Sequence, residues 1–201
     1  MSVTEQGRRI SRVARDLRPS GIREFFDLVV GMDDVISLGV GEPDFPTPWR
    51  ACDAVIESLR HGATSYTSNR GTLELRVEIA EYLSERFGVQ YDPEEEILIT
   101  VGASEAVDLA MRVLLDPGDE FLVPDPAYVS YAPCVELAYG HAVAVPTHLE
   151  DEFRIKPGPL SDACSERTRG LLFCNPSNPT GAIMRREDLE AVAEVARDRD
   201  L

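Results

Sequence analysis

The chain of 201 residues is almost devoid of lysine, since Lys156 is the only one. Its 36 acidic residues outnumber the 20 lysines and arginines, which gives a formal net charge of −16. Such an acidic excess argues against nucleic acid or an anionic membrane as a partner. It also suggests a salt-adapted cytoplasm, where ions screen the repulsion between carboxylates, so we expect a halophilic protein.

Patterns typical of metal sites, disulfide frameworks and membrane proteins are also missing. The four cysteines are scattered without a CxxC pair, so we expect free, buried thiols. The three histidines form no HExxH or similar pattern, and no metal is predicted. No run of 18 apolar residues occurs, and the first residues do not resemble a signal peptide. We therefore expect a cytoplasmic protein without a membrane span.

Short apolar runs alternate with segments of helical periodicity along the chain. The runs predict strands at 35–38, 97–100, 121–123, 142–145 and 171–174. The periodic segments predict helices at 22–30, 48–61, 73–87, 102–115, 159–165 and 187–199. Residues 1–18 are compatible with a short amphipathic arm or a frayed terminus. Strands that alternate with helices predict an α/β fold with a mainly parallel sheet.

Particular residues mark the expected helix ends and the expected core. Thr47 is expected to be an N-cap with Pro48 in the first turn, and Thr72 to cap the next helix. Gly62 and Gly88 are expected to end these two helices. The helix at 102–115 has little polar face and should be buried. A buried stripe is expected on the helix at 73–87, formed by Leu73, Val77, Ala80, Leu83 and Phe87.

The segment Asn175-Pro176-Ser177-Asn178-Pro179-Thr180-Gly181 follows the last predicted strand directly. Ligands of open α/β sheets bind just outside the carboxyl ends of the strands. An asparagine there can reach a ligand with its amide, and prolines on either side fix the backbone that aims it. Taken alone, the segment is equally compatible with a rigid turn.

A second candidate site is the turn Gly102-Ala103-Ser104 between a predicted strand and a predicted helix. Free N–H groups converge at a helix N-terminus, and the helix dipole favours negative charge there, so the turn predicts an anion site. Ordinary N-capping by Ser104 is the alternative, and it is compatible with anion binding.

Four segments, in this order, resemble the class I and II aminotransferases of fold type I, which depend on pyridoxal 5′-phosphate (PLP). They are Gly39–Phe45, Tyr66–Gly71, Thr100–Ala106 and Asn175–Gly181. The resemblance runs from about Ile22 to the last residue. It implies a three-layer α/β/α fold in which 46–201 form the N-terminal part of the large PLP-binding domain. Residues 1–45 would form an arm and part of a smaller second domain, and the C-terminal half of the family fold would be absent.

The resemblance also implies roles for individual residues. Backbone N–H groups of Ala103 and Ser104 would bind the PLP phosphate, the Tyr128 ring would stack on the pyridine ring, and Asn178 would bond the 3′-oxygen. Tyr66 would donate its hydroxyl to the cofactor phosphate of the neighbouring subunit, which implies a homodimer with shared active sites. Backbone at Gly41 would meet the substrate α-carboxylate. For Tyr66 simple packing, and for Gly41 a plain loop, remain the alternatives.

The remaining machinery of the family does not occur in this sequence. The lysine that forms the Schiff base with PLP, the pyridine-nitrogen Asp and the carboxylate-binding Arg would follow Leu201. Lys156 matches no family motif and is expected to be a solvated surface residue. Hence no catalytic residue is predicted within 1–201, and these residues alone are predicted to be inactive.

The activity implied by the resemblance is transfer of an amino group from an α-amino acid to a 2-oxo acid. Aspartate, aromatic or alanine-type substrates are compatible with the motifs, which do not select among them. A PLP-dependent lyase or synthase of the same fold is one alternative. A non-catalytic PLP-binding module is the other.

Overall fold

The computed structural model describes residues 9–17, 36, 41 and 43–201. They belong to two compact units: unit 1 comprises Met1–Pro19 and Val101–Leu201, and unit 2 comprises Ser20–Thr100. The helix expected at 22–30 and nearly all of the strand expected at 35–38 lie outside the described residues. The expected division at residue 45 stays a prediction.

Unit 1 is built on a parallel sheet of three strands in the order β2-β1-β3. The strands are β1 (Glu120–Asp125), β2 (His141–Pro146) and β3 (Thr168–Leu171). In the central strand, Leu122 lies opposite Val143 of β2 and Leu171 of β3. The predicted α/β class with a parallel sheet is therefore confirmed, as are the strands expected at 121–123 and 142–145.

The third strand lies earlier in the chain than expected: it ends at Leu171 instead of running from 171 to 174. Proline in the neighbouring strand accounts for its end. The Leu172 amide still donates to the Leu122 carbonyl at 2.9 Å. Alternate residues of a strand face the same neighbour, so the next donor toward β3 would be residue 124. Pro124 has no N–H, and the ladder stops there.

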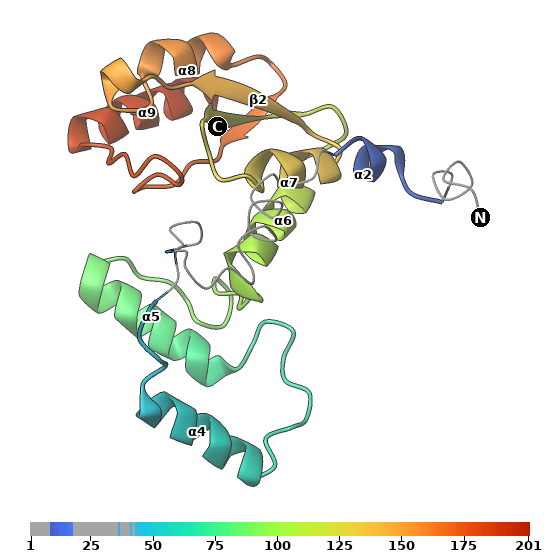
Figure 1. The fold of residues 1–201 in the computed structure, drawn as a ribbon, viewed down its shortest axis with the longest axis vertical. Helices are drawn as coiled ribbons and strands as arrows, with labels where there is room; N and C mark the ends of the chain where they lie inside the picture. The colour runs from blue at the N-terminus through green and yellow to red at the C-terminus, as the bar shows by residue number, and fades with distance from the viewer. Residues whose placement is uncertain (1–8, 18–35, 37–40, 42) are drawn as a thin grey trace. The chain divides into compact units, whose positions relative to one another are not determined.

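Helices cover both faces of this sheet. Successive side chains of a strand point to opposite faces, and in β1 the apolar side chains on each face pack into a core of their own. Leu122 points into a core with α8 (Pro157–Ala163) and α9 (Arg186–Arg199). Its neighbour Phe121 points into a second core with α6 (Gly102–Leu114) and α7 (Tyr131–Leu137). Figure 1 shows these three layers of unit 1, with α8 and α9 on one side of the strands and α6 and α7 on the other.

Close packing on the second face requires a glycine in β3. A Cβ added at Gly170 would lie 2.5 Å from a ring carbon of Phe121, well inside van der Waals contact. The sheet unit is completed by α2 (Arg12–Asp16) and by the 3-10 turn η1 (Leu149–Asp151). The start of α2 is capped by Ser11, whose hydroxyl accepts from the Ala14 amide at 3.2 Å.

Unit 2 contains α4 (Trp49–Arg60) and α5 (Leu73–Phe87). Thr72 caps α5 as predicted, since its hydroxyl accepts from the Leu75 amide at 3.4 Å. Gly88 ends the helix in the left-handed conformation with φ 69°. The N-cap expected at Thr47 is wrong: Pro48 holds that position with ψ 133°, which is not helical, so α4 begins only at Trp49.

Two expectations for unit 2 are wrong because burial and strand pairing depend on a neighbouring element. Residues 97–100 form no strand, and the described part of unit 2 contains no other strand that could pair with them. The Ile99 amide donates instead to the Arg70 carbonyl at 3.1 Å. The stripe expected on α5 is not buried either: Leu73 and Phe87 are 41% and 62% exposed, and Arg76 is the buried residue of this helix.

The expected burial of α6 holds in part. Met111 is buried, but Val113 is 82% exposed and Leu114 54%. The four cysteines are free as predicted, although Cys52 is exposed and the other three are only half-buried. No described helix combines the length and the apolar character that a membrane crossing requires.

Candidate functional site

The segment that follows β3 forms a compact loop closed by its own hydrogen bonds. We call residues 175–185 the asparagine loop. The Ser177 amide donates to the Ala182 carbonyl and the Gly181 amide to the Ser177 carbonyl, both at 2.8 Å. Gly181 has φ 71°, a left-handed conformation that glycine adopts without strain. Asn178 of this loop is exposed.

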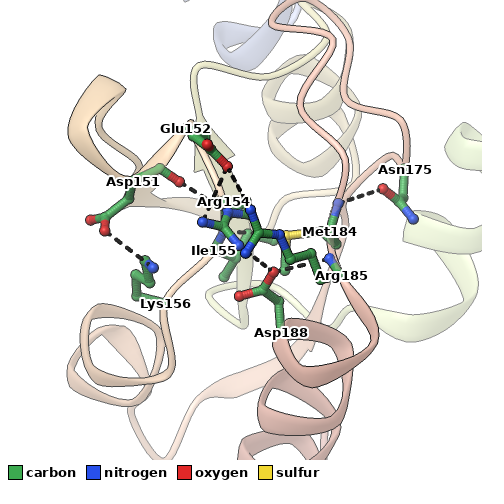
Figure 2. Close-up of polar contacts among 9 residues, drawn as sticks. All are labelled: Asp151, Glu152, Arg154, Ile155, Lys156, Asn175, Met184, Arg185 and Asp188. Carbon is green, nitrogen blue, oxygen red and sulfur yellow. Dashed lines mark hydrogen bonds and ion pairs between the residues drawn. The ribbon is translucent and has the colours of Figure 1, made fainter.

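The base of the loop is fixed by Asn175, which the sequence offered only as part of a turn. Its side-chain oxygen accepts a hydrogen bond from the Met184 amide at 3.0 Å (Figure 2). Met184 itself is 7% exposed and belongs to the core on the α8–α9 face. The loop that carries Asn178 is therefore anchored to the hydrophobic core.

Asn178 lines a pocket at the carboxyl end of the parallel strands, where ligands of such sheets bind. The walls come from the end of β1 with the following segment, from α7, from the segment before α8, from the residues after β3 and from the asparagine loop. The lining residues are Pro124, Pro126, Ala127, Tyr131, Phe153, Ile155, Phe173, Cys174, Ser177, Asn178, Ala182 and Met184. Asn178, Ser177, Cys174 and Tyr131 thus line this hollow together with apolar residues.

Tyr128 lies beside this pocket and is held by a second aromatic ring. The rings of Tyr128 and Tyr131 are 5.6 Å apart at 77°, an edge-to-face contact. Tyr131 is half-buried and lines the pocket. Burial, together with the neighbouring Cys174, raises the pKa of the Tyr131 phenol. Its three-residue spacing from Tyr128 was the signal in the sequence.

The N-cap of α6 makes no side-chain hydrogen bond to the first turn of the helix. Val101 is the N-cap, and no side chain caps the helix, so N-capping by Ser104 is not observed. Gly102 has φ 80° with no atom near the place of a Cβ, which leaves room above the turn. The Glu105 carboxylate accepts from the Val101 amide. Ala103 and Ser104 are exposed here, and they are not among the residues that line the Asn178 pocket.

The other two predicted site residues lie in unit 2. Tyr66 is fully exposed, and Gly41 is exposed with nothing within 4 Å of the position of a Cβ. Both residues are accessible to a ligand or a partner, and their roles stay predictions.

Lys156 is less solvated than expected. Its ammonium group lies 3.1 Å from Asp151, and its side chain is 35% exposed (Figure 2). It precedes α8 as the N-cap residue and does not line the pocket. Among the described residues no group of histidines, cysteines and carboxylates could hold a metal ion.

The described residues fit PLP in three respects. The uncapped start of α6 suits a phosphate, the half-buried Tyr128 ring suits a planar conjugated ring, and the Asn178 amide suits a phenolic oxygen. An amine for the cofactor aldehyde is not part of this arrangement, since the only lysine is ion-paired with Asp151.

Comparison with known proteins gives a consistent result. The model of the family "Aminotransferase class I and II" matches residues 33–201. The aspartate aminotransferase of Pyrococcus abyssi is 45% identical over 185 residues, 92% of this chain and 48% of that protein. The aromatic-amino-acid aminotransferase 2 of Thermococcus litoralis is 43% identical over 185 residues, again 92% of this chain and 48% of that protein.

A solved structure agrees with these relatives. The aromatic aminotransferase from Pyrococcus horikoshii matches with a TM-score of 0.81 at 44% identity, over 90% of this chain and 48% of that one. The chain spans about half the length of the relatives it matches.

Proposed function

The chain belongs to the class I and II aminotransferase family, which depends on PLP, and we propose that the whole protein moves an amino group from an α-amino acid to a 2-oxo acid. The observation that carries this proposal is the place of Asn178. It lines one pocket with Tyr131 and Ala127, at the carboxyl ends of β1 and β3. A parallel sheet offers its binding crevice at that edge.

In this proposal each described residue has a binding or orienting role. PLP, when bound, supplies the electron sink that makes the α-carbon of an amino acid acidic. The Asn178 amide donates to its 3′-oxygen, and the Tyr128 ring, supported by Tyr131, stacks on its ring. Backbone N–H groups of Ala103 and Ser104 bind its phosphate at the start of α6.

The substrates are proposed from the relatives and from one glycine. Two similar proteins are named for aspartate and for aromatic amino acids, so these are the amino donors we propose first. An alanine-type donor remains the third possibility. Gly41, which is exposed and open on its Cβ side, would let the substrate α-carboxylate approach the backbone.

The assembly we propose is a homodimer with shared active sites. Tyr66 is fully exposed, and its hydroxyl would reach the cofactor phosphate of the neighbouring subunit. Residues 1–201 alone are proposed to be inactive, because Lys156 is ion-paired with Asp151 and lines no part of the pocket.

The test uses the natural full-length protein, reconstituted with PLP, and a ¹⁵N-labelled amino acid with 2-oxoglutarate. Aspartate, phenylalanine and alanine serve as donors in parallel. Label in glutamate supports the aminotransferase. Label released as ammonia favours the lyase of the same fold, and PLP binding without turnover favours the non-catalytic binding module. Either of the last two results contradicts the proposed function.

A further inference from the structure

A cluster of charged residues in unit 1 joins the segment before α8 to the end of the asparagine loop and the start of α9. Its centre is Arg154, whose side chain is only 13% exposed (Figure 2). The guanidinium lies 3.1 Å from Asp188 of α9 and 3.2 Å from Glu152. Asp188 is equally enclosed, with 12% of its side chain exposed. A charge pair this enclosed depends on both partners, because removal of one leaves the other buried and unpaired.

Asp188 connects this pair to the end of the asparagine loop. Its carboxylate accepts from Arg154 and, at 2.9 Å, from the backbone amide of Arg185. Burial by itself raises the pKa of Asp188, but the Arg185 amide and the Arg154 guanidinium outweigh it and hold this pKa below its ordinary value. The carboxylate is therefore ionised, and it fixes the backbone at the last residue of the loop.

The same contacts continue to the base of the loop. Arg185 directly follows Met184, whose amide is bonded to the Asn175 side chain at 3.0 Å. On the other side, the Ile155 amide, next to Arg154, donates to the Met184 sulfur at 3.4 Å. Figure 2 shows the resulting row of contacts, from Arg154 and Asp188 through Met184 to Asn175.

The backbone that presents Arg154 is held in an unfavourable conformation. Glu152 and Phe153 have φ values of 56° and 54°, in the left-handed region that residues other than glycine rarely adopt. Such a conformation persists only where the surroundings hold it. Here Glu152 is ion-paired with Arg154 and with Arg185 at 3.5 Å, and Phe153 lines the Asn178 pocket.

We propose that Arg154 and Asp188 are a positioning pair, which sets the place of Asn178 by fixing both the base of the asparagine loop and the opposite wall of the pocket. Arg154 acts on the wall through its neighbours Phe153 and Ile155. Asp188 acts on the loop through Arg185 and Met184. The inference rests on the proposed function, because it assigns to Asn178 the binding of PLP.

The test compares Arg154→Met with Arg186→Met in the natural full-length protein. Arg186 is the matched control: it lies at the start of α9, the helix that carries Asp188, is 88% exposed, and pairs with Glu190 at 3.4 Å. Hydrogen exchange of the peptide 176–184 is measured without PLP, and the dissociation constant of PLP is measured by absorbance. Arg154→Lys, which keeps the charge, tests for rescue.

We expect Arg154→Met to speed exchange of this peptide about tenfold and to weaken PLP binding about tenfold. Arg154→Lys should recover part of both effects, and Arg186→Met should match the wild type. Asp188→Asn should reproduce Arg154→Met, and the double variant should be no worse than either single change. If Arg154→Met fails to fold, the same two measurements are made on the double variant Arg154→Met/Asp188→Asn. This variant buries no unpaired charge, because both members of the pair are replaced by neutral residues.

Two results would overturn the positioning pair while leaving the proposed function intact. One is wild-type exchange and PLP affinity in Arg154→Met. The other is faster exchange spread evenly over the protein, with no excess in 176–184. A wild-type protein that fails to bind PLP would instead contradict the proposed function, and local exchange in 176–184 would still support the link between Arg154 and the loop.

Discussion

The side-chain oxygen of Asn175 accepts a hydrogen bond from the amide of Met184 at 3.0 Å, and this contact joins the two ends of the asparagine loop. The loop presents Asn178 at the pocket, while Met184 belongs to the hydrophobic core. The two asparagines of the segment therefore lie in different surroundings: Asn175 joins the ends of the loop, and Asn178 lines the pocket, where we propose that it contacts PLP.

Replacement of these two asparagines should separate stability from cofactor binding. Asn175→Ala leaves the partly buried Met184 amide without its acceptor, which costs about 1–3 kcal/mol of unfolding free energy. Asn178→Ala removes an exposed side chain and should change stability by less than about 0.5 kcal/mol, while PLP affinity falls. Urea unfolding and PLP titration of the full-length variants measure both. Equal stability losses in the two variants would contradict this division.

The Tyr128 ring should contribute to PLP affinity by stacking. Tyr128→Leu removes the aromatic face and should weaken PLP binding by about 0.5–1.5 kcal/mol. This corresponds to a roughly two- to twelvefold increase in the dissociation constant. Tyr128→Phe keeps the ring and its edge contact with Tyr131, so it serves as the control. If Tyr128→Phe loses as much affinity as Tyr128→Leu, stacking is not the role of this residue.

Asp119 should make stability depend on pH in the acid range. The pKa of Asp119 lies below its ordinary value of 3.8. The main cause is a hydrogen bond from the Arg169 side chain, and the second is a hydrogen bond from the Asp116 amide. A lowered pKa in the folded state contributes stability above the unfolded pKa, and this contribution is lost as pH falls through the folded pKa.

The matched variant Asp119→Asn removes this titration. Its stability deficit against the wild type should be complete at neutral pH and should shrink as pH drops below 3.8. Unfolding measured in urea at a series of pH values checks this. A deficit that stays constant down to the acid limit would show that Asp119 acts through packing alone.

Salt should raise the melting temperature of the full-length protein. The net charge of −16 on this chain makes carboxylates repel one another, and salt screens that repulsion. We expect the melting temperature to rise between about 0.1 and 2 M KCl, over which the Debye length falls from about 10 Å to below 3 Å. Sucrose of equal osmolality is the control for general exclusion effects. Melting that is indifferent to KCl would count against the expected halophilic character.

Local patterns predicted the sheet of unit 1 because its strands carry their own signal. The apolar runs in β1 and β2 are short and bounded by turn residues. In unit 2 the Thr72 cap was predictable for a similar reason, because it joins residues only three positions apart. The third strand was misplaced by three residues, since its end depends on Pro124 of a different strand. The strand expected at 97–100 has the same apolar pattern, but a strand forms only beside a partner.

The candidate site was predictable only where one residue can act by itself. The place of the segment after a strand indicated only that an asparagine could reach a ligand, and the resemblance to the family singled out Asn178, which lines a pocket in the structure. The Arg154–Asp188 pair joins residues 34 positions apart, and Asn175 reaches Met184 nine positions away. Neither contact has a pattern in the sequence, because it is made by the way the loop folds back on α9 and the segment before α8.

The most direct test of this account is a crystal structure of the natural full-length protein with PLP. The account predicts PLP at the carboxyl ends of β1 and β3, with its 3′-oxygen within hydrogen-bond distance of the Asn178 amide and its ring on Tyr128. Its phosphate is predicted at the start of α6, against Ala103 and Ser104. PLP bound at another place, or at this edge without contact to Asn178, would contradict the account.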